Sequence, residues 1–442
     1  MPFNTEKSAE LHKRAYQVIP AGVNSNTRAR KPYPYYFRRA RGAEVWDVDG
    51  NRYLDLIMGN GAVILGHGDS RVQDAVARVL DTGLTIGVEW EGAVEVAEQF
   101  LRIVRTMDLV RFSNTGTEAM MHALHVARYA TGRVGVAKAE GSYHGWSDEV
   151  FVSAWPDVNC LGSLDAPISL AGSAGLHPDA VNSVLVLPFN DIARTRALIE
   201  EHAHELAAVI VEPVLIDIGY IPATGEYLRA LRQICTKHGI VLIFDELLTG
   251  FRLAPGGAQE YYDVVPDLAT YGKALANGYP IAALAGCEEL MRLTEPGNGP
   301  AFVGTFNGHA VSVAAASATL PLLADGSLQR TLAVRTERLR RAFAEAAEPL
   351  GIGAQLCGGG GHLQWYFTAV SIRDYRSAAT TDARLYATFV AALANCGILV
   401  GSNPLSHQAI SLAHDEHVLE ELELAFHSGL EAVANARSAG QD

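Results

Sequence analysis

The sequence predicts an α/β protein with a large domain built on a mainly parallel central sheet flanked by helices, and a smaller α+β domain. Through the middle of the 442-residue chain, short apolar runs alternate with stretches of helical periodicity, as in β-α units stacked into a parallel sheet. The two ends differ, because short β-prone segments stand near the N-terminus and a helix-rich tail follows residue 310. The length also favours two or three units over one.

The N-terminal segment is predicted to open with a helix and a small sheet. Residues 46–48 and 52–54 form the two arms of a hairpin around Asp49-Gly50, a dipeptide typical of tight turns. We assign residues 1–70 to the smaller domain, residues 71–310 to the large domain, and residues 311–442 to the C-terminal part of the smaller domain.

The middle of the chain supplies the predicted parallel sheet. A strand at 109–112, a helix at 117–130 and a strand at 134–137 form one unit. Apolar runs at 207–211 and 240–244 predict two more strands, with a helix from about 227 to 237 between them. Residues 268–271 predict a further strand.

The C-terminal part is predicted to be mainly helical. It contains a helix from about 310 to 320 ended by Pro321, a helix at 328–347, strands at 363–368 and 410–412, and a last helix from 415 towards 434. Residues 357–361, a cysteine followed by four glycines, form either a flexible joint or a close approach of backbone, and we favour the second.

Composition excludes several classes of protein. Hydrophobic residues make up 49% and charged residues 19%, which favours a compact soluble globule. The net charge of −14 disfavours nucleic acid and anionic lipid surfaces as partners. The first residues lack the apolar stretch of a secretory signal, and no apolar run is long enough to cross a membrane, so we expect a cytoplasmic protein. Five scattered cysteines and the His202-Ala203-His204 segment do not support a metal site.

Three segments between strands and helices carry reactive side chains. Asp245 ends an apolar strand, and Lys273 follows the next strand-like run. In parallel sheets both positions lie at the carboxyl edge, where such folds bind ligands. Residues 113–119 could hold a phosphate at a helix N-terminus. Each feature also has an ordinary explanation: a surface salt bridge for a lone Asp or Lys, and a capping box formed by Thr115 and Glu118.

Together these parts are the ones that pyridoxal phosphate requires. A lysine can form an imine with the cofactor aldehyde. An aspartate can keep the pyridine nitrogen protonated, so that the ring accepts electrons. A phosphate cradle and an aromatic side chain, Tyr143, complete the set. The combination therefore favours this cofactor over the separate ordinary explanations.

From about residue 19 to residue 426, the sequence resembles the class III aminotransferases of pyridoxal-phosphate fold type I. Within them it is most similar to the glutamate-1-semialdehyde aminomutase-like branch. The resemblance rests on the order and spacing of nine motifs: GAEVWDVDG at 42–50, ILGH at 64–67, NTGTEA at 114–119, SYHG at 142–145, VEP at 211–213, FDE at 244–246, TGFR at 249–252, GKA at 272–274 and GTF at 304–306.

The resemblance implies roles for individual residues around the cofactor. It makes Lys273 the lysine that forms the Schiff base and moves the proton, and Asp245 the partner of the pyridinium nitrogen. Gly116 and Thr117 would bind the phosphate, and Tyr143 would stack on the ring.

Three further roles are implied by the same resemblance. Thr305 stands where relatives reach the phosphate bound in the opposite subunit, which implies a homodimer. Glu212 lies near the cofactor in relatives. Arg28 matches an arginine that clamps a substrate carboxylate, and a guanidinium suits a carboxylate well, although a plain surface arginine remains the alternative.

The chain departs from the aminomutase pattern at several positions predicted to lie near the substrate. Asn60 replaces a tryptophan, Asp217 replaces an asparagine close to the phenolic oxygen of the cofactor, and Leu247 replaces a valine. Glu89 and Trp90 fall where the family pattern is small or polar, which places them at the pocket mouth. We therefore list Asn60 and Trp90 with Arg28 as candidate substrate-binding residues, and expect a substrate other than glutamate semialdehyde.

The leading hypothesis is an aminotransferase that moves an amino group from an amino acid donor to a carboxylate-bearing keto or aldehyde acceptor. The alternatives are an intramolecular aminomutase of the glutamate-1-semialdehyde type and an amino-acid racemase or epimerase. A cofactor-binding dimer without turnover is disfavoured by the intact Lys273, Asp245 and Thr117. A nicotinamide dehydrogenase is disfavoured by the lack of a G-x-G-x-x-G motif after the first strand of a β-α-β unit.

Overall fold

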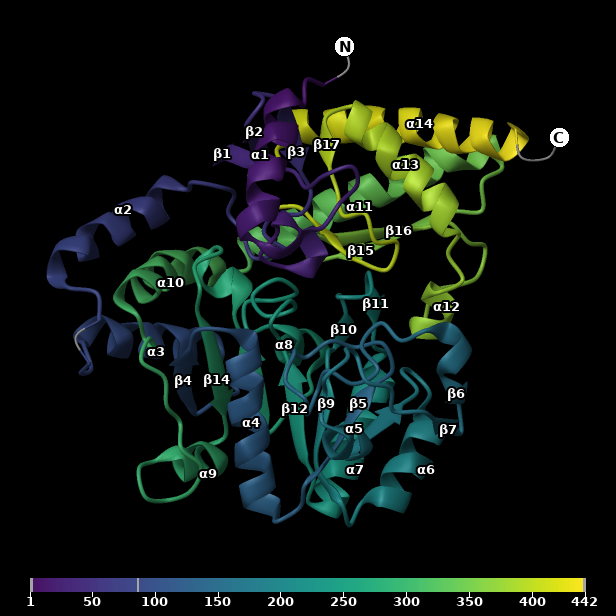
Figure 1. The fold of residues 1–442 in the computed structure, drawn as a ribbon. Coiled ribbons are helices and arrows are strands. Elements are labelled where there is room, and N and C mark those ends of the chain that lie inside the picture. Colours follow the sequence, from purple (N-terminus) through teal and green to yellow (C-terminus); the bar gives the residue numbers. More distant parts are fainter. Residues whose placement is uncertain (1–2, 86, 440–442) are drawn as a thin grey trace.

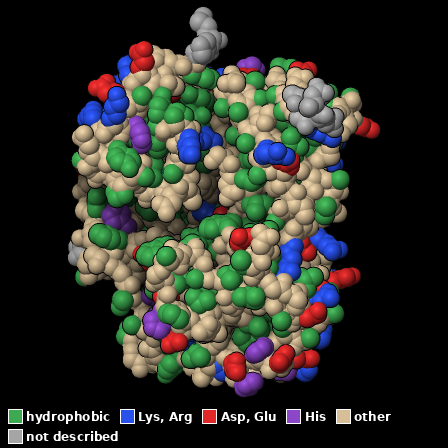
Figure 2. Space-filling view, turned by 45° about the vertical axis from the view of Figure 1, so that its right-hand side comes forward, with side chains coloured by type: hydrophobic (Ala, Val, Ile, Leu, Met, Phe, Trp, Pro, Cys, Tyr) green, Lys and Arg blue, Asp and Glu red, His purple; other side chains and the backbone are tan. Residues whose placement is uncertain are grey.

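A computed structural model describes residues 3–85 and 87–439 of the chain (Figure 1). The lower part of the view holds a large sheet with helices around it, and the upper part holds smaller sheets with the first and last helices. On the face drawn in Figure 2, the surface is hollowed between these two parts. The chain thus has the α/β architecture predicted from its sequence.

The large sheet has seven strands in the order β4-β14-β13-β12-β9-β5-β8. Its mainly parallel character is confirmed, since only β14 runs antiparallel to its neighbours β13 and β4. Strands buried along their whole length need apolar runs without alternation, which is what the sequence shows at β9 and β12. The strand bounds are Leu109–Ser113 (β4), Gly135–Ala139 (β5), Val184–Leu187 (β8), Leu206–Val211 (β9), Val241–Asp245 (β12), Leu268–Tyr271 (β13) and Ala282–Gly286 (β14).

The helices around this sheet begin and end at residues suited to caps. Thr115 caps α4 by accepting the Glu118 N–H, and Thr224 caps α7 in the same way. Both helices end at a glycine with left-handed backbone. The bounds are Ser70–Val79 (α2), Glu91–Ile103 (α3), Gly116–Thr131 (α4), Pro178–Asn182 (α5), Ile192–His202 (α6), Gly225–His238 (α7), Ala258–Tyr262 (α8) and Glu288–Met291 (α9).

The upper part joins the two ends of the chain. The predicted hairpin forms β2 and β3, and β17 pairs in parallel with β3, so that N-terminal and C-terminal segments share one sheet. A second sheet has the order β15-β16-β18. The strand bounds are Phe37–Arg41 (β1), Glu44–Asp47 (β2), Arg52–Asp55 (β3), Gln355–Gly359 (β15), His362–Tyr366 (β16), Ile398–Leu399 (β17) and Gln408–Ala409 (β18).

The remaining helices are Glu6–Val18 (α1), Ala310–Leu323 (α10), Ser327–Ala347 (α11), Tyr375–Ala378 (α12), Ala383–Asn395 (α13) and Glu416–Ala439 (α14). In the upper part, α11 packs on β15 and α14, and α13 packs along α14, whereas α10 packs on α2 and α3 of the lower part. Four two-residue strands complete the elements: Gly162–Ser163 (β6), Ala166–Pro167 (β7), Val214–Leu215 (β10) and Ile221–Pro222 (β11). The domain boundaries at 70/71 and 310/311 stay predictions.

Two sequence predictions for the C-terminal part need correction. Pro321 does not end α10, which continues to Leu323 because Leu320 and Leu323 are fully buried in the core. Residues 410–412 are not a strand; β18 ends at Ala409, and the Leu412 N–H instead donates to the Ile64 carbonyl.

The close backbone approach favoured for residues 357–361 is present. Gly360 and Gly361 have positive φ and turn the chain between β15 and β16. A Cβ at Gly360 would lie 3.2 Å from the Arg252 carbonyl oxygen, and one at Gly361 would lie 3.1 Å from the Ile410 carbonyl oxygen.

Within residues 3–85 and 87–439, no single helix is long and apolar enough to cross a membrane. One pair of helices, α10 together with the helical stretch from Ser327 to Leu350, passes that test jointly by length and composition but is bent by 74°.

Candidate active site

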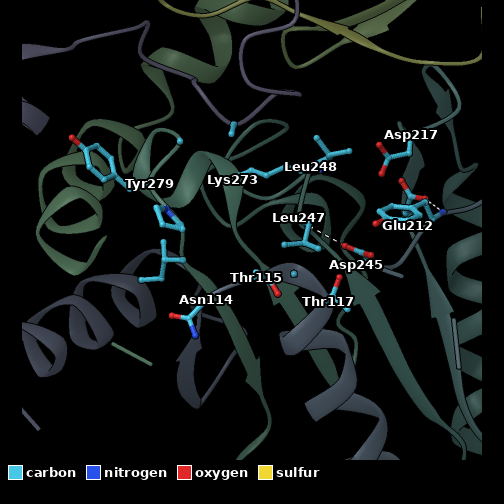
Figure 3. Close-up of a pocket in the computed structure, with 17 residues that line it drawn as sticks. Asn114, Thr115, Thr117, Glu212, Asp217, Asp245, Leu247, Leu248, Lys273 and Tyr279 are labelled. Atoms are coloured by element: carbon cyan, nitrogen blue, oxygen red, sulfur yellow. Dashed lines mark hydrogen bonds between the residues drawn. The ribbon is translucent and has the colours of Figure 1, made fainter. Parts of the chain in front are cut away.

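A cavity of about 270 Å³ lies at the carboxyl edge of the large sheet (Figure 3). Its wall comes from the segments that follow β4, β5, β9, β12 and β13. These segments meet because the carboxyl ends of parallel strands lie at one edge of a sheet. Six residues predicted from the sequence line it together: Gly116, Thr117, Tyr143, Glu212, Asp245 and Lys273.

The N-terminus of α4 forms one end of the cavity. Thr115 caps the helix by accepting the Glu118 N–H at 3.2 Å, but the Glu118 carboxylate accepts the Asn114 N–H at 2.8 Å, so the predicted capping box lacks its return bond to Thr115. A Cβ at position 116 would overlap the Leu247 side chain, so a larger residue here requires Leu247 to move. Backbone N–H groups in the first turn of a helix have no partner within the helix and carry positive potential. This end therefore suits an anion such as a phosphate.

Asp245 forms a buried pair with His144. The His144 Nδ1 atom lies 2.8 Å from Asp245 Oδ2, and the Leu247 N–H donates to Oδ1 at 3.1 Å. Burial lowers the pKa of His144, and the hydrogen bond to Asp245 only partly opposes this. His144 is therefore a neutral donor that orients the carboxylate, leaving Asp245 as a fixed negative charge in the wall.

Tyr143 and Glu212 form the neighbouring wall. The Tyr143 ring stacks on Trp155, with centroids 4.9 Å apart and planes inclined by 20°. Glu212 accepts hydrogen bonds from the Tyr143 N–H at 3.1 Å and the Ile216 N–H at 3.2 Å. Burial, followed by the charges of Asp217 and Asp245, raises the pKa of Glu212 well above its usual value. Burial thus favours the protonated form of the Glu212 carboxyl.

Lys273 follows β13 and begins a 3₁₀ turn, Lys273–Ala276. Its φ of 47° is a left-handed conformation that costs a non-glycine residue free energy and is found mostly where function requires it. Lys273 lines the cavity, and Figure 3 shows its side chain extending towards Leu248, above Leu247, Thr115 and Thr117. The amine is therefore the nucleophilic group of the site.

Four predicted residues do not line this cavity. Arg28 lies in the exposed 3₁₀ turn Asn26–Arg28, and Asn60 is exposed with a φ of 54°, although its neighbour Ala62 does reach the cavity. Trp90 and Thr305 line a separate cavity of about 1000 Å³. The substrate-binding roles of Arg28, Asn60 and Trp90, and the role of Thr305 at a phosphate, stay predictions.

The structure also adds residues that the site prediction omitted. His144 belongs to the quoted motif at 142–145, so its pairing with Asp245 could have been proposed from the sequence. Trp155 gave no sequence signal. Asp217 and Leu247, noted only as departures, both line the cavity. Within residues 3–85 and 87–439, no group of three or more His, Cys, Asp or Glu side chains could hold a metal ion.

Comparison with known proteins settles the family. The model of the class III aminotransferases matches residues 25–421. The chain belongs to the class III aminotransferases. It is 40% identical over 420 residues to a glutamate-1-semialdehyde 2,1-aminomutase of Methanothermobacter thermautotrophicus, covering 95% of this chain and 98% of that relative.

Two solved structures are also similar to this class III chain. One is an omega-transaminase from Sphaerobacter thermophilus, with a TM-score of 0.90 and 34% identity over 96% of this chain and 97% of the other. The second is described as a transaminase with PLP bound, with a TM-score of 0.90 and 31% identity over 98% and 99% of the two chains. The family prediction is confirmed, and the relatives include both mutases and transaminases.

The lining of the cavity fits pyridoxal phosphate, the cofactor predicted from the sequence. A glycine-walled helix N-terminus suits the phosphate, and Gly145, with a φ of 108°, packs so closely on Thr117 that a Cβ would come within 2.8 Å of its hydroxyl. Asp245 supplies a carboxylate for a protonated ring nitrogen, and Lys273 supplies an amine for the aldehyde. The donor set and the shape of the cradle thus agree with one cofactor.

Proposed function

We propose that this chain catalyses amino-group transfer with pyridoxal phosphate bound in the cavity. One observation carries the proposal: Lys273 and Asp245 face the same cavity as the N-terminus of α4. A solved relative described as a transaminase with PLP bound supports the choice of cofactor. When bound, the cofactor supplies an aldehyde that condenses with amines and a protonated ring that accepts the electron pair left by a departing proton.

The residues of the chain divide the work around that group. The backbone N–H groups at Gly116 and Thr117, with the Thr117 hydroxyl, bind the phosphate. Asp245, oriented by His144, holds a proton at the ring nitrogen. The Tyr143 ring, stacked on Trp155, offers a flat apolar surface to one face of the cofactor.

Lys273 moves the proton. Its amine lies in the cavity on a flexible four-carbon stem, so it can act first as the nucleophile that anchors the cofactor and then as a general base. As a base it must be uncharged when it takes the proton from the carbon that bears the substrate amine. The same amine would return the proton to the carbon that was the cofactor aldehyde, on the other side of the shared nitrogen, which is the proton movement that mutases and transaminases share.

The reaction that we propose is an intramolecular aminomutase reaction on a carboxylate-bearing amino aldehyde. Its support is the 40% identity, over nearly the full length of both chains, to a glutamate-1-semialdehyde 2,1-aminomutase. We therefore propose the aminomutase, one of the alternatives drawn from the sequence, over the aminotransferase, which was the leading hypothesis. The reason is that the similar curated protein is named as an aminomutase.

A transaminase acting between two molecules is the second candidate. Asp217 and Leu247, two departures from the aminomutase pattern, both line the cavity, so the substrate surface differs from that of the mutases. The omega-transaminase from Sphaerobacter thermophilus is also 34% identical to this chain. Either reaction uses the same Lys273 and Asp245.

The need for an added amino donor separates the two. The purified protein with its cofactor is given glutamate 1-semialdehyde alone, and the product is analysed by mass spectrometry. An isomerised product of unchanged mass, formed without an added donor and without release of a keto acid, supports the mutase. Turnover only with an added amino acid, with release of its keto acid, supports the transaminase. No turnover of either kind contradicts both.

We further propose that the active unit is a homodimer. Thr305 lines the second cavity with Trp90, and large apolar side chains stand exposed beside it, among them Val88, Val303 and Phe306. A second copy that covers this surface would bring Thr305 to the phosphate of the cofactor bound in that copy. The proposal that Arg28 binds a substrate carboxylate is to be tested in this dimer. The substrate partners remain small molecules, an amino donor and a carbonyl compound that carries a carboxylate.

A further inference from the structure

Lys138 is a fully buried lysine that the proposed mechanism does not use. It lies in β5, between β8 and β9, with none of its surface exposed. Lysine side chains are seldom buried in this way, because an amine without hydrogen-bond partners in an apolar interior costs free energy. Burial lowers the pKa of the Lys138 amine to about 7, and the nearby Glu212 opposes this only in part. The partners of the amine therefore indicate what this lysine does.

The Lys138 amine connects two segments of the chain. Its Nζ donates to the Ser142 carbonyl at 2.7 Å and to the Val152 carbonyl at 2.5 Å. An amine carries at least two N–H donors whether it is charged or neutral, so both bonds form in either state. Ser142 directly precedes Tyr143, and Val152 stands three residues before Trp155. Lys138 thus connects the two segments that carry the stacked Tyr143 and Trp155 rings.

The second of these segments needs such support, because its backbone is strained. Ser153 and Trp155 have φ values of 47° and 49°, in the left-handed region that non-glycine residues adopt only when their surroundings fix them. The Gly141 N–H donates to the Ser153 carbonyl at 2.9 Å, and the Trp155 Nε1–H donates to the Asp217 carbonyl at 3.1 Å. Lys138 adds a bond to the same segment from within a strand of the large sheet.

The ring that these segments support is Tyr143, which lines the cavity. Trp155 stacks on one face of Tyr143, which leaves the other face for the cofactor, and the Phe151 ring meets Tyr143 edge to face with centroids 6.0 Å apart. The strength of aromatic stacking depends on the offset and tilt of the two rings. A shift of either segment would therefore change the surface that Tyr143 offers to the cofactor.

We propose that Lys138 is a positioning residue for the cofactor: by binding the Ser142 and Val152 carbonyls, it keeps Tyr143 stacked between Trp155 and the bound ring. This inference rests on the cofactor of the proposed function, and not on which amino transfer it performs. Lys138 is not in the cavity wall, so it acts through Tyr143 and is not itself a catalytic residue.

The variant Lys138→Met tests this role. Methionine fills a similar space with a flexible apolar chain, but it removes both donors, so the Ser142 and Val152 carbonyls lose this partner. We expect the dissociation constant of pyridoxal phosphate, measured by equilibrium dialysis, to rise about 2- to 10-fold, the loss that one aromatic stacking contact accounts for. At saturating cofactor, the circular dichroism of the cofactor absorption band should also change, because it reports the asymmetric surroundings of the ring.

Arg133→Met is the matched control for a merely structural effect. Arg133 stands two residues before β5, and its Nη1 donates to the carbonyls of Ala203 at 3.1 Å and Leu206 at 3.2 Å. It therefore makes comparable bonds at the opposite end of the same strand. We expect Arg133→Met to lower the thermal midpoint while leaving cofactor affinity and circular dichroism unchanged. Equal cofactor affinities in Lys138→Met and Arg133→Met overturn the inference.

A double-mutant cycle measures whether Lys138 acts through Tyr143. In Tyr143→Leu the stacking ring is absent, so adding Lys138→Met should change the dissociation constant of the cofactor by less than about twofold. A loss of affinity of the same size in the wild-type and Tyr143→Leu backgrounds means that Lys138 does not act through this ring, and it overturns the inference.

Trp155→Leu keeps the inference testable if Lys138→Met does not fold. It removes the ring that holds Tyr143 in place, so we expect the same rise in the dissociation constant, and again little change in the Tyr143→Leu background. Unchanged cofactor affinity in Trp155→Leu overturns the inference. A wild-type protein that does not bind pyridoxal phosphate overturns the proposed function instead.

Discussion

Asp245 and Lys273 leave neighbouring strands of the same sheet. Asp245 is the last residue of β12 and stands opposite Thr270 of β13, and Lys273 follows Thr270 by three residues. Parallel pairing therefore brings an acid and an amine, 28 positions apart in the sequence, to one edge of the sheet. Their shared cavity follows from strand register rather than from a local motif.

Replacing the lysine tests its chemical role. Lys273→Ala removes the nucleophile and the proton carrier, so we expect amino transfer to fall by about 10²- to 10⁴-fold, the usual contribution of general acid–base catalysis. Steady-state turnover measures the effect. Lys237→Ala, a surface lysine paired with Glu200, is the control and keeps activity. Activity of Lys273→Ala within tenfold of the wild type would contradict the assignment.

The phosphate cradle can be tested by steric exchange. Gly116→Ala places a Cβ against Leu247, and crowding of this kind costs about 1–3 kcal/mol. We expect weaker binding of pyridoxal phosphate, measured by equilibrium dialysis, with restored binding in the double variant Gly116→Ala/Leu247→Ala. If the second substitution gives no recovery, the close packing on Leu247 is not what requires glycine.

Buried His414 predicts a loss of stability in acid. Its Nδ1 accepts the Ser411 N–H at 3.1 Å, and its Nε2 lies 3.1 Å from the Asp55 carbonyl, which together require the neutral ring. Burial lowers the pKa of His414 to about 4 in the folded chain, against about 6.5 when unfolded. The unfolded state then binds more protons between these values, so its contribution to stability is complete above about pH 6.5 and is lost as the pH falls towards 4.

Urea unfolding at several pH values measures this contribution. We expect His414 to account for up to about 3 kcal/mol of acid destabilisation between pH 6.5 and 4. The variant His414→Gln should therefore show a shallower decline in acid than the wild type, whereas the exposed His204→Gln should follow the wild type. Parallel curves for His414→Gln and the wild type would refute the prediction.

Buried Arg252 holds three segments together. Its guanidinium donates to the carbonyls of Gly61 at 2.7 Å, Gly360 at 3.2 Å and Ile410 at 3.5 Å. Lysine cannot reproduce this fork, so Arg252→Lys should lower the free energy of unfolding by about 1–3 kcal/mol. Thermal denaturation checks this against the surface variant Arg340→Lys, and equal midpoints for the two would be evidence against the clamp.

The proposed homodimer is tested at the exposed apolar surface beside Thr305. The Phe306 side chain is 56% exposed, and Phe306→Asp would place a charge in the proposed interface. We expect sedimentation at the monomer mass and weaker cofactor binding. Val334→Asp, at a similarly exposed position on α11, is the control and should remain dimeric. A wild-type chain that sediments as a monomer would contradict the dimer outright.

Much of the fold was predictable because its signals are local. The apolar runs that became β9, β12 and β13 must be buried on both faces of a parallel sheet, and Thr115 and Gly132 bound α4 as caps. The errors arose where distant contacts decide the structure. Burial of Leu323 carries α10 past Pro321, and the Leu412 N–H donates to the distant Ile64 carbonyl instead of pairing in a strand.

The site shows the same division. Asp245, Lys273 and the α4 cradle were predictable, since each ends a recognisable strand or begins a helix. The substrate residues were harder, because spacing alone cannot say whether Asn60 or Trp90 faces the cavity of its own chain. The approach of His407 to Asp217, with Nδ1 and Oδ1 3.8 Å apart, depends on packing across some 190 residues of sequence, which local patterns do not encode.

The most direct test of the account is to locate the bond between cofactor and protein. The holoenzyme is reduced with borohydride, digested and analysed by peptide mass spectrometry. The account predicts a pyridoxyl group on the peptide that contains Lys273, and on no other lysine. A modification at another lysine, or none at all in protein saturated with pyridoxal phosphate, would contradict it.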